Sequence, residues 1–421
     1  MAGQIIKVEK MVAGGNCIGR LNGKNVFVPY AVPGETLEVE ITKSFRDYDL
    51  ARIVRVLEPS SHRIEPFCPL YGGDEGKCGG CNMQHIDYEF QKKLRAEILR
   101  DCFEREGLTS PEIEIISADE KNYRSRIQLT DGGFNSKESN SVVNLSNCPV
   151  ATNEINSYLA MTSQNERPSG RVHIFGDRRV LNAQNEKFAN VVVADEDEVY
   201  SSVGKVSGAG KNRLNKVKNN LNHRFMGTRQ NSENVCSVTL KGKKIDFDVK
   251  GFFQSNLDVL EKTIDAVCYN MGGKNVLDMY AGCGTFSVFL SDIFEKTFLV
   301  EHNRDALVFA EMNLAGKKHE SYGQSGEKWV LQNARNVILN NGNFDAVVID
   351  PPRSGMEKQV CKWLCENKVG QIRSVSCNPS THARDAKFLV KSGYILSKLY
   401  LLDFYPQTSH IESLAFFEYY A

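Results

Sequence analysis

The part of the chain from about residue 251 alternates short apolar strands with helical stretches, and a polar turn follows each strand. The runs are KNVLDMYAGCGTF, KTFLVEHN, FDAVVIDPPRSG, QIRSVSCNPS and YILSKLYLLDFYPQ. Strands that are apolar on both faces and separated by helices predict a mostly parallel sheet covered on both sides. We therefore expect a doubly wound α/β domain over residues 251–421, with a ligand site where the strands end.

The rest of the chain is expected to form two further units. Residues 1–59 contain four alternating runs, QIIKVEKMV, NVFVPYAV, ETLEVEITKSF and LARIVRVLEP, separated by Gly- or Pro-containing turns. They predict a small β-barrel of a kind that commonly binds RNA or single strands. Residues 60–250 are expected to form a central α+β domain, with a helix from Asp87 to Glu106 and strand-like runs such as EIEIIS, SRIQLT, RVHIF and SVTLKGKKIDFDVK.

Charge and cysteine content narrow the class of protein. The formal net charge is zero, which argues against a general nucleic-acid binder of the histone type. One segment differs: residues 201–232 contain seven lysines and arginines and no acidic residue. It is either a solvated loop or a segment that meets phosphates. Twelve cysteines without a secretion signal or a run of 18 apolar residues predict a cytoplasmic protein with reduced thiols and no membrane association.

Acidic residues follow two of the predicted strands. In VLDMYAGCGTFS, Asp278 precedes a turn with two glycines, and Glu301 ends the next strand, TFLVEHN, twenty-three residues later. An acidic side chain at that place can accept hydrogen bonds from both ribose hydroxyls of a nucleoside-like cofactor. The pair is typical of the S-adenosylmethionine (SAM) site of doubly wound methyltransferases. The alternative for Glu301 is a surface residue at a strand end.

Three further residues carry possible chemistry. Asp350 ends a strand before two prolines, and Cys377 ends the next strand and enters the polar turn NPST. We expect both at one rim of the sheet, with Cys377 as a nucleophile and with Asn378 and Thr381 as possible donors to substrate. Glu412 enters an apolar strand and is a candidate general base. The alternatives are a turn former, a buried structural cysteine and an edge-strand residue, respectively.

Four cysteines form a possible metal site. They are Cys68, Cys78, Cys81 and Cys148, which include one CxxC pair. Four thiolates suit either tetrahedral zinc or a [4Fe–4S] cluster, and the spacing alone does not separate the two. The spacing does not match the CxxxCxxC loop of a radical-SAM enzyme.

Several of these motifs together resemble one enzyme family. GFFQSN, LDMYAGCGTF, VEHN, DPPRSG, SCNPSTHARD and FYPQTSHIE resemble, in this order, the SAM-dependent RNA uracil-5-methyltransferases, which modify transfer RNA or large ribosomal RNA. The N-terminal barrel resembles the TRAM domain of the ribosomal-RNA branch. The resemblance implies that Cys377 adds to C6 of uracil, that Glu412 removes the C5 proton and that Asp350 lies between cofactor and base. It also implies a SAM pocket lined by Gln254, Tyr280, Thr285, Glu301, Asn333 and Asp350.

The resemblance also bears on the metal and the partner. It favours a [4Fe–4S] cluster over zinc at the four cysteines, although the nine residues between Cys68 and Cys78 exceed the usual family gap. We expect a monomer that binds RNA, with ribosomal RNA favoured over transfer RNA. Two alternatives are an amino-group methyltransferase, which would not need Cys377, and a non-catalytic RNA-binding protein with a methyltransferase fold.

Overall fold

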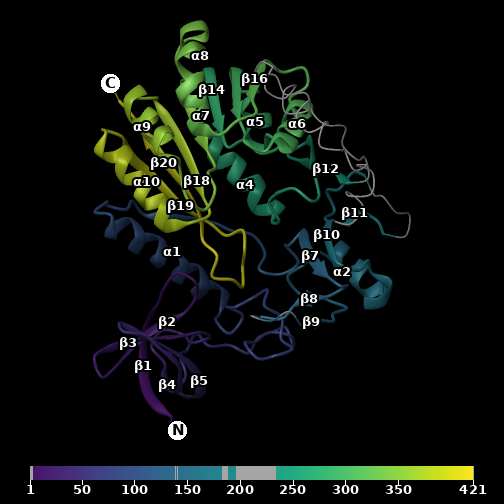
Figure 1. Cartoon of the computed structure of the whole chain (residues 1–421), viewed down its shortest axis with the longest axis vertical. Coiled ribbons are helices and arrows are strands. Elements are labelled where there is room, and N and C mark those ends of the chain that lie inside the picture. Colours follow the sequence, from purple (N-terminus) through teal and green to yellow (C-terminus); the bar gives the residue numbers. More distant parts are fainter. Residues whose placement is uncertain (1–2, 138, 140, 183–187, 196–233, 421) are drawn as a thin grey trace, which may run out of the picture.

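The computed structural model describes residues 3–137, 139, 141–182, 188–195 and 234–420, so the basic segment 201–232 lies outside the described residues. Figure 1 shows the N-terminal strands at one end of the molecule and the C-terminal sheet at the other, with the central strands beside them. Within the described ranges, no helix combines the length and the apolar character needed to cross a membrane.

The N-terminal strands close into a barrel. They are β1 (Gln4–Met11), β2 (Cys17–Leu21), β3 (Lys24–Val28), β4 (Thr36–Ser44) and β5 (Tyr48–Glu58), in the order β1-β2-β3-β5-β4. Alternate side chains point inward, and Val8, Val26 and Leu37 are fully buried. The sequence predicted four strands and assigned β2 to a turn. That assignment was wrong, because Gly19 lies within β2 where a strand passes close by: a Cβ there would lie 2.7 Å from the Lys7 carbonyl oxygen.

A long helix follows the barrel. α1 spans Tyr88–Arg105, and the Asp87 side chain caps it by accepting a hydrogen bond from the Phe90 amide at 2.9 Å. Leu94, Leu99 and Phe103 are buried along one side. The helix predicted from the apolar stripe is therefore confirmed.

The central region consists of small sheets. Its strands are β7 (Arg126–Thr130), β8 (Phe134–Asn135), β9 (Val142–Val143), β10 (Arg171–Gly176), β11 (Val191–Asp195), β12 (Val235–Leu240) and β13 (Lys243–Asp248). They pair as β11-β10-β7, β8-β9 and β12-β13. Its helical segments are α2 (Asn153–Met161) and the 3-10 turn η1 (Gln164–Glu166). The strand-like runs of the sequence are thus found as strands.

The C-terminal sheet has eight strands in the order β16-β15-β14-β17-β18-β20-β19-β6. The strands are β6 (Ile113–Ile116), β14 (Gly273–Met279), β15 (Phe294–Val300), β16 (His319–Tyr322), β17 (Ala346–Ile349), β18 (Gln371–Ser376), β19 (Ile395–Leu402) and β20 (Glu412–Glu418). β6 comes from the region that the sequence assigned to the central domain. It pairs in parallel with β19, from Leu399 with Ile113 to Leu402 with Ile116.

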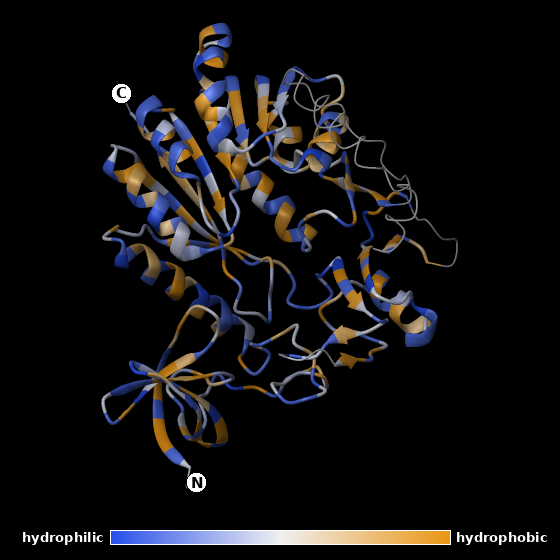
Figure 2. Cartoon of the chain, in the orientation of Figure 1, coloured by the Kyte–Doolittle hydropathy of each residue, from blue (hydrophilic) through white to orange (hydrophobic). Residues whose placement is uncertain are grey.

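Helices cover both faces of this sheet. They are α4 (Leu257–Cys268), α5 (Thr285–Leu290), α6 (Arg304–Asn313), α7 (Gly326–Gln332), α8 (Ala334–Asn341), α9 (Lys358–Asn367) and α10 (Pro379–Lys391). Leu277 and Met279 of β14 pack with α1 and α7–α10, whereas Val276 packs with α4–α6. In Figure 2 the strands are mainly hydrophobic, and the helices alternate between hydrophobic and hydrophilic residues. The doubly wound domain predicted from the sequence is confirmed.

Candidate active site

The strand directions bring the predicted catalytic residues to one edge of the sheet. β14, β15, β17 and β18 are parallel, so the residues after them meet at their carboxyl edge. β20 runs antiparallel to β18, and Ser376 pairs with Ser413. Cys377 and Glu412 are the next residues outward from this pair, so they leave neighbouring strands at the same edge. Asp350 follows β17, the strand on the other side of β18.

Glu301 stabilises the glycine turn after β14. Its carboxylate accepts hydrogen bonds from the Gly282 amide at 2.8 Å and from the Asn303 amide at 2.5 Å. Tyr280 begins the turn with a φ of +65°, a backbone conformation that is unfavourable for a bulky residue and is often found at functional sites. The Tyr280 hydroxyl lies 3.2 Å from a Glu357 carboxylate oxygen. The turn is therefore held in one shape beside the predicted ribose-binding carboxylate.

Two polar side chains near this edge, Gln254 and Asp278, have a buried oxygen without a protein partner among the described residues, and Asn333 Nδ2 also lacks one. Asp278 is 1% exposed, and Ser287 donates to its other oxygen at 2.5 Å. Burial, together with the charges of Asp350 and Glu301, raises the pKa of Asp278 to about 7. Asn333 stands where α7 ends and α8 begins. Such orphaned groups fit a site that is completed by a polar ligand.

Thr285 and Cys283 lie on the helix side of the turn. Thr285 is the first residue of α5, and its hydroxyl lies 3.4 Å from the Cys283 sulfur. Cys283 is buried, and its burial raises the pKa of the thiol to about 11. Cys283 therefore packs in the core.

The charge of Asp350 raises the pKa of both Cys377 and Glu412. Glu412 is 6% exposed. Burial, followed by the charge of Asp350, raises its pKa to about 8, while a hydrogen bond from the Gln254 side chain and the charge of Arg353 oppose the shift. Burial also raises the pKa of Asp350 to about 7, with a contribution from Glu301. For half-buried Cys377, burial and then the charges of Glu412 and Asp350 raise the thiol pKa, and Arg353 lowers it.

Arg353 was missed in the sequence, although it stands directly after the two prolines of DPPRSG. It is the cation that favours the charged forms of both Cys377 and Glu412. Its backbone is fixed by the start of α10: Asn378 Nδ2 and the Thr381 hydroxyl each donate to the Arg353 carbonyl oxygen at 3.1 Å. Asn378 and Thr381 were named as possible donors to substrate, and in this structure both donate to the loop that carries Arg353.

The four predicted metal cysteines line one pocket of about 490 Å³, together with Gln84 and Arg124. All four are free thiols. Burial raises the pKa of Cys78, Cys81 and Cys148, and neighbouring cysteines of the set contribute to each shift. The Gly80 amide donates to the Cys78 sulfur at 3.4 Å. Over the described residues, no group of three or more His, Cys, Asp or Glu side chains is arranged so that it could hold a metal ion.

The four thiols line one pocket, with an amide donor to one sulfur. This donor set suits either a [4Fe–4S] cluster or a zinc ion. The metal itself stays a proposal.

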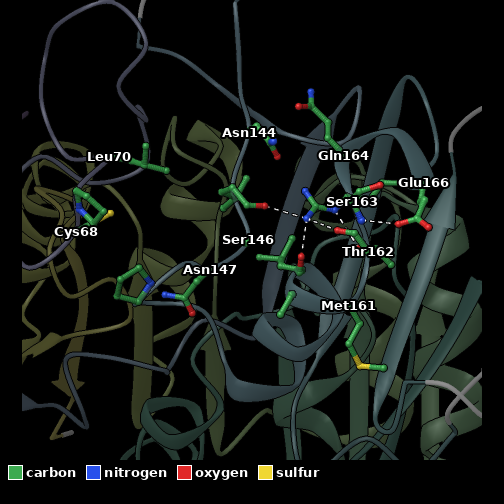
Figure 3. Close-up of a pocket in the computed structure, with 16 residues that line it drawn as sticks. Cys68, Leu70, Asn144, Ser146, Asn147, Met161, Thr162, Ser163, Gln164 and Glu166 are labelled. Carbon is green, nitrogen blue, oxygen red and sulfur yellow. Dashed lines mark hydrogen bonds between the residues drawn. The ribbon is translucent and has the colours of Figure 1, made fainter.

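A second pocket, of about 640 Å³, shares Cys68, Leu70 and Pro149 with the first. Figure 3 shows Cys68 at one side of it and the segment from Met161 to Glu166 at the other. Its buried Arg167 donates to the carbonyl oxygens of Gly132, Leu145, Leu159 and Thr162. That guanidinium therefore joins these segments of the central region.

Comparisons with known proteins agree with this geometry. The family model described as tRNA (Uracil-5-)-methyltransferase matches residues 211–419, and the TRAM domain model matches residues 4–54. An uncharacterized RNA methyltransferase of Treponema denticola is 34% identical over 99% of both chains. The 23S rRNA (uracil(1939)-C(5))-methyltransferase RlmD of Legionella pneumophila is 28% identical over 99% of this chain and 98% of its own.

One solved structure shares the fold over nearly the whole chain. It is the tRNA (uracil-54, C5)-methyltransferase of Pyrococcus abyssi in complex with S-adenosyl-L-homocysteine. The TM-score is 0.67 at 23% identity, with 98% of this chain and 100% of the other covered.

Proposed function

Because the chain belongs to the SAM-dependent RNA uracil-5-methyltransferases, we propose that it methylates C5 of a specific uridine in 23S ribosomal RNA. The relative named as a 23S rRNA methyltransferase covers almost all of this chain, barrel included. The observation that carries the chemistry is the placement of Cys377, Asp350 and Glu412 at one edge of the sheet.

The reaction begins with the nucleophile. The Cys377 thiolate adds to C6 of the uracil ring, and the electrons of the C5–C6 double bond give C5 the character of an enolate carbon. SAM, when bound, supplies the electrophilic methyl group that C5 takes up. Glu412 then removes the proton from C5, the double bond re-forms, and the thiolate leaves from C6. The target uridine must leave its stack or lie in a loop to reach this edge.

The pKa shifts suit these roles. A carboxylate whose pKa is raised to about 8 is a far stronger base than an ordinary glutamate, and about one-tenth of it is ionised at pH 7. Arg353 counteracts the burial that disfavours the Cys377 thiolate. Asp350 raises the pKa of Glu412, so it strengthens the base.

In this proposal the cofactor site extends from this edge toward Glu301. Glu301 would accept hydrogen bonds from the ribose hydroxyls, and the turn after Tyr280 lies against it. Among the described residues, Gln254 and Asn333 each have a buried polar atom without a partner, and Thr285 begins α5. With Asp350, these residues would hold SAM.

We also propose that Cys68, Cys78, Cys81 and Cys148 hold a [4Fe–4S] cluster that ties the central region together. Anaerobic reconstitution of the full chain, followed by iron, sulfide and zinc analysis and by absorption spectra, tests this. About four irons and four sulfides per chain are expected. One tightly bound zinc without sulfide would replace the cluster by a structural zinc site.

The decisive experiment uses methyl-labelled SAM with unmodified 23S rRNA and unmodified transfer RNA in separate reactions. Label in 5-methyluridine of the ribosomal RNA is expected, and Cys377→Ala should abolish it. Label only in the transfer RNA would move the substrate to that class. Label in a methylated adenosine or cytidine, or activity that survives Cys377→Ala, would refute the mechanism.

The base is tested separately. Glu412→Gln should accumulate a covalent protein–RNA adduct that withstands denaturing gels, because the methylated ring keeps its C5 proton and cannot expel the thiolate. Cys377→Ser should form none. Normal turnover of Glu412→Gln would assign the base to another residue.

A further inference from the structure

The loop between β19 and β20, residues 403–411, ends at Glu412 and is held by residues from distant parts of the chain. In Figure 1 this loop, in yellow, extends from the sheet past α1 toward the lower half of the view. At its start, Asp403 accepts hydrogen bonds from Arg95 Nη1 and from the Tyr88 hydroxyl, both at 2.7 Å. Further on, the Tyr123 hydroxyl donates to the Pro406 carbonyl oxygen at 2.9 Å.

The middle of the loop is fixed through Gln407. This residue is 1% exposed and has a φ of +68°, a conformation that persists only where surrounding contacts impose it. The Gln91 side chain makes two of these contacts: its Nε2 donates to Gln407 Oε1 at 2.9 Å, and its Oε1 accepts from the Gln407 amide at 3.1 Å. The Asn82 and Met83 amides donate to the Gln407 carbonyl oxygen at 3.1 and 3.0 Å.

Asn82 also forms hydrogen bonds with the loop close to the start of β20. Its Oδ1 accepts from the Ser409 amide, and its Nδ2 donates to the Ser409 hydroxyl, both at 2.9 Å. Asn82 directly follows Cys81, and Ser409 precedes Glu412 by three residues. One side chain therefore connects the cysteine segment to the strand that carries the proposed base.

The barrel reaches the same point. The turn between β1 and β2 brings the Gly14 carbonyl oxygen within 3.4 Å of Asn82 Nδ2. Gly15 packs so closely that a Cβ there would lie 2.8 Å from Ser409 Cβ and 2.9 Å from Asn82 Nδ2. Three segments far apart in the sequence thus meet at the Asn82–Ser409 pair.

We propose that Asn82 is a positioning residue for the reaction: through Ser409 it fixes the start of β20 against the barrel turn and the cysteine segment, and so sets the place of Glu412. Asn82 touches no reacting atom. The inference rests on the proposed role of Glu412. It also predicts that a change in the turn between β1 and β2 displaces Glu412, the proposed general base.

Neighbouring glycines supply a matched pair of variants. Gly14 and Gly15 both have positive φ, +93° and +84°, so alanine strains the backbone at either position. Only at Gly15 does the new methyl group meet the Asn82–Ser409 pair, because nothing lies within 4 Å of a Cβ on Gly14. Gly15→Ala therefore pushes a methyl group against the Asn82–Ser409 pair, and Gly14→Ala is its control. Asn82→Ala removes both bonds to Ser409, and Ser409→Ala removes one as the milder variant.

Two readouts separate positioning from simple loss of stability. Because Glu412 acts after methyl transfer, its displacement should slow release of the product, so adduct accumulates during turnover. We expect Asn82→Ala and Gly15→Ala to lower kcat about 10- to 100-fold, and the KM for RNA should fall with kcat because the adduct accumulates. Hydrogen exchange at residues 411–413 of the full chain should become faster in both variants, and Gly14→Ala, which strains the backbone without the methyl contact, should show a smaller change in every readout.

The outcomes decide the inference in each case. Exchange at residues 411–413 that is the same in Asn82→Ala, Gly15→Ala and Gly14→Ala would overturn it, as would a lower melting temperature with a normal adduct fraction. If Glu412→Gln accumulates no adduct, the proposed base has failed. The exchange measurement then still decides whether Asn82 fixes the start of β20.

Discussion

Burial of Glu412 should make the free energy of unfolding fall as pH rises, and Glu412→Gln should remove that fall. The pKa of Glu412 is raised from an ordinary 4.5 to about 8 in the folded chain. Between these values the folded protein retains a proton that the unfolded chain has released, so stability declines as pH rises and levels off above about 8. At about 1.4 kcal/mol per pH unit, the decline is at most about 5 kcal/mol. Glutamine cannot ionise and contributes no such slope.

The measurement is urea unfolding of the wild type, Glu412→Gln and the control Glu9→Gln at several pH values between 5 and 9. Glu9 is exposed on the barrel. The variant should gain stability relative to the wild type as pH rises, by at least about 2 kcal/mol between pH 5 and 8.5, whereas Glu9→Gln should follow the wild type. Parallel curves for the wild type and Glu412→Gln would refute the claim that the folded protein holds this carboxyl protonated.

Other predictions concern the cofactor, the pH profile and the cysteine pocket. Asp350→Asn removes a charge that raises the pKa of both Cys377 and Glu412, so the midpoint of adduct formation against pH, followed on quenched gels, should move to lower pH; an unmoved midpoint contradicts this. Glu301→Ala should weaken SAM binding about 10- to 100-fold in calorimetry, and an unchanged Kd would remove Glu301 from the cofactor site. Cys81→Ser should reduce iron bound after reconstitution, while Cys365→Ser, on α9, should not; equal iron in both would place the metal elsewhere.

The sequence predicted which residues meet at the carboxyl edge, because in a parallel sheet this depends only on where each strand ends. Glu301, Asp350 and Cys377 each follow an apolar run, and in a parallel sheet the ends of such runs meet without further information. Glu412 is different. It begins an antiparallel strand, and its placement beside Cys377 depends on the pairing of Ser376 with Ser413. Its entry into an apolar strand made it a candidate general base, and the family resemblance added the step in which it would act.

Contacts between segments that are far apart along the chain leave no such pattern in the amino-acid sequence. Asn82 and Ser409 are 327 positions apart, and Gln91 and Gln407 are 316 apart. Each is an ordinary polar residue in its local sequence, so neither periodicity nor turn chemistry marks it. The partner of β6 was hidden for the same reason, since a short edge strand carries no sign of which sheet it joins.

Bonds between distant segments also fix the proposed active site in place, even though its buried carboxyls lower the stability of the fold. Burial raises the pKa of Asp278, Asp350 and Glu412 together, and each such carboxyl lowers stability at neutral pH. The loop before Glu412 is held by the buried ion pair between Arg95 and Asp403, whose side chains are 1% and 0% exposed. Buried ion pairs add little net stability, but they penalise any arrangement that separates the two charges. This bond therefore serves to specify one position of the loop, and that is what the proposed general base at the start of β20 requires.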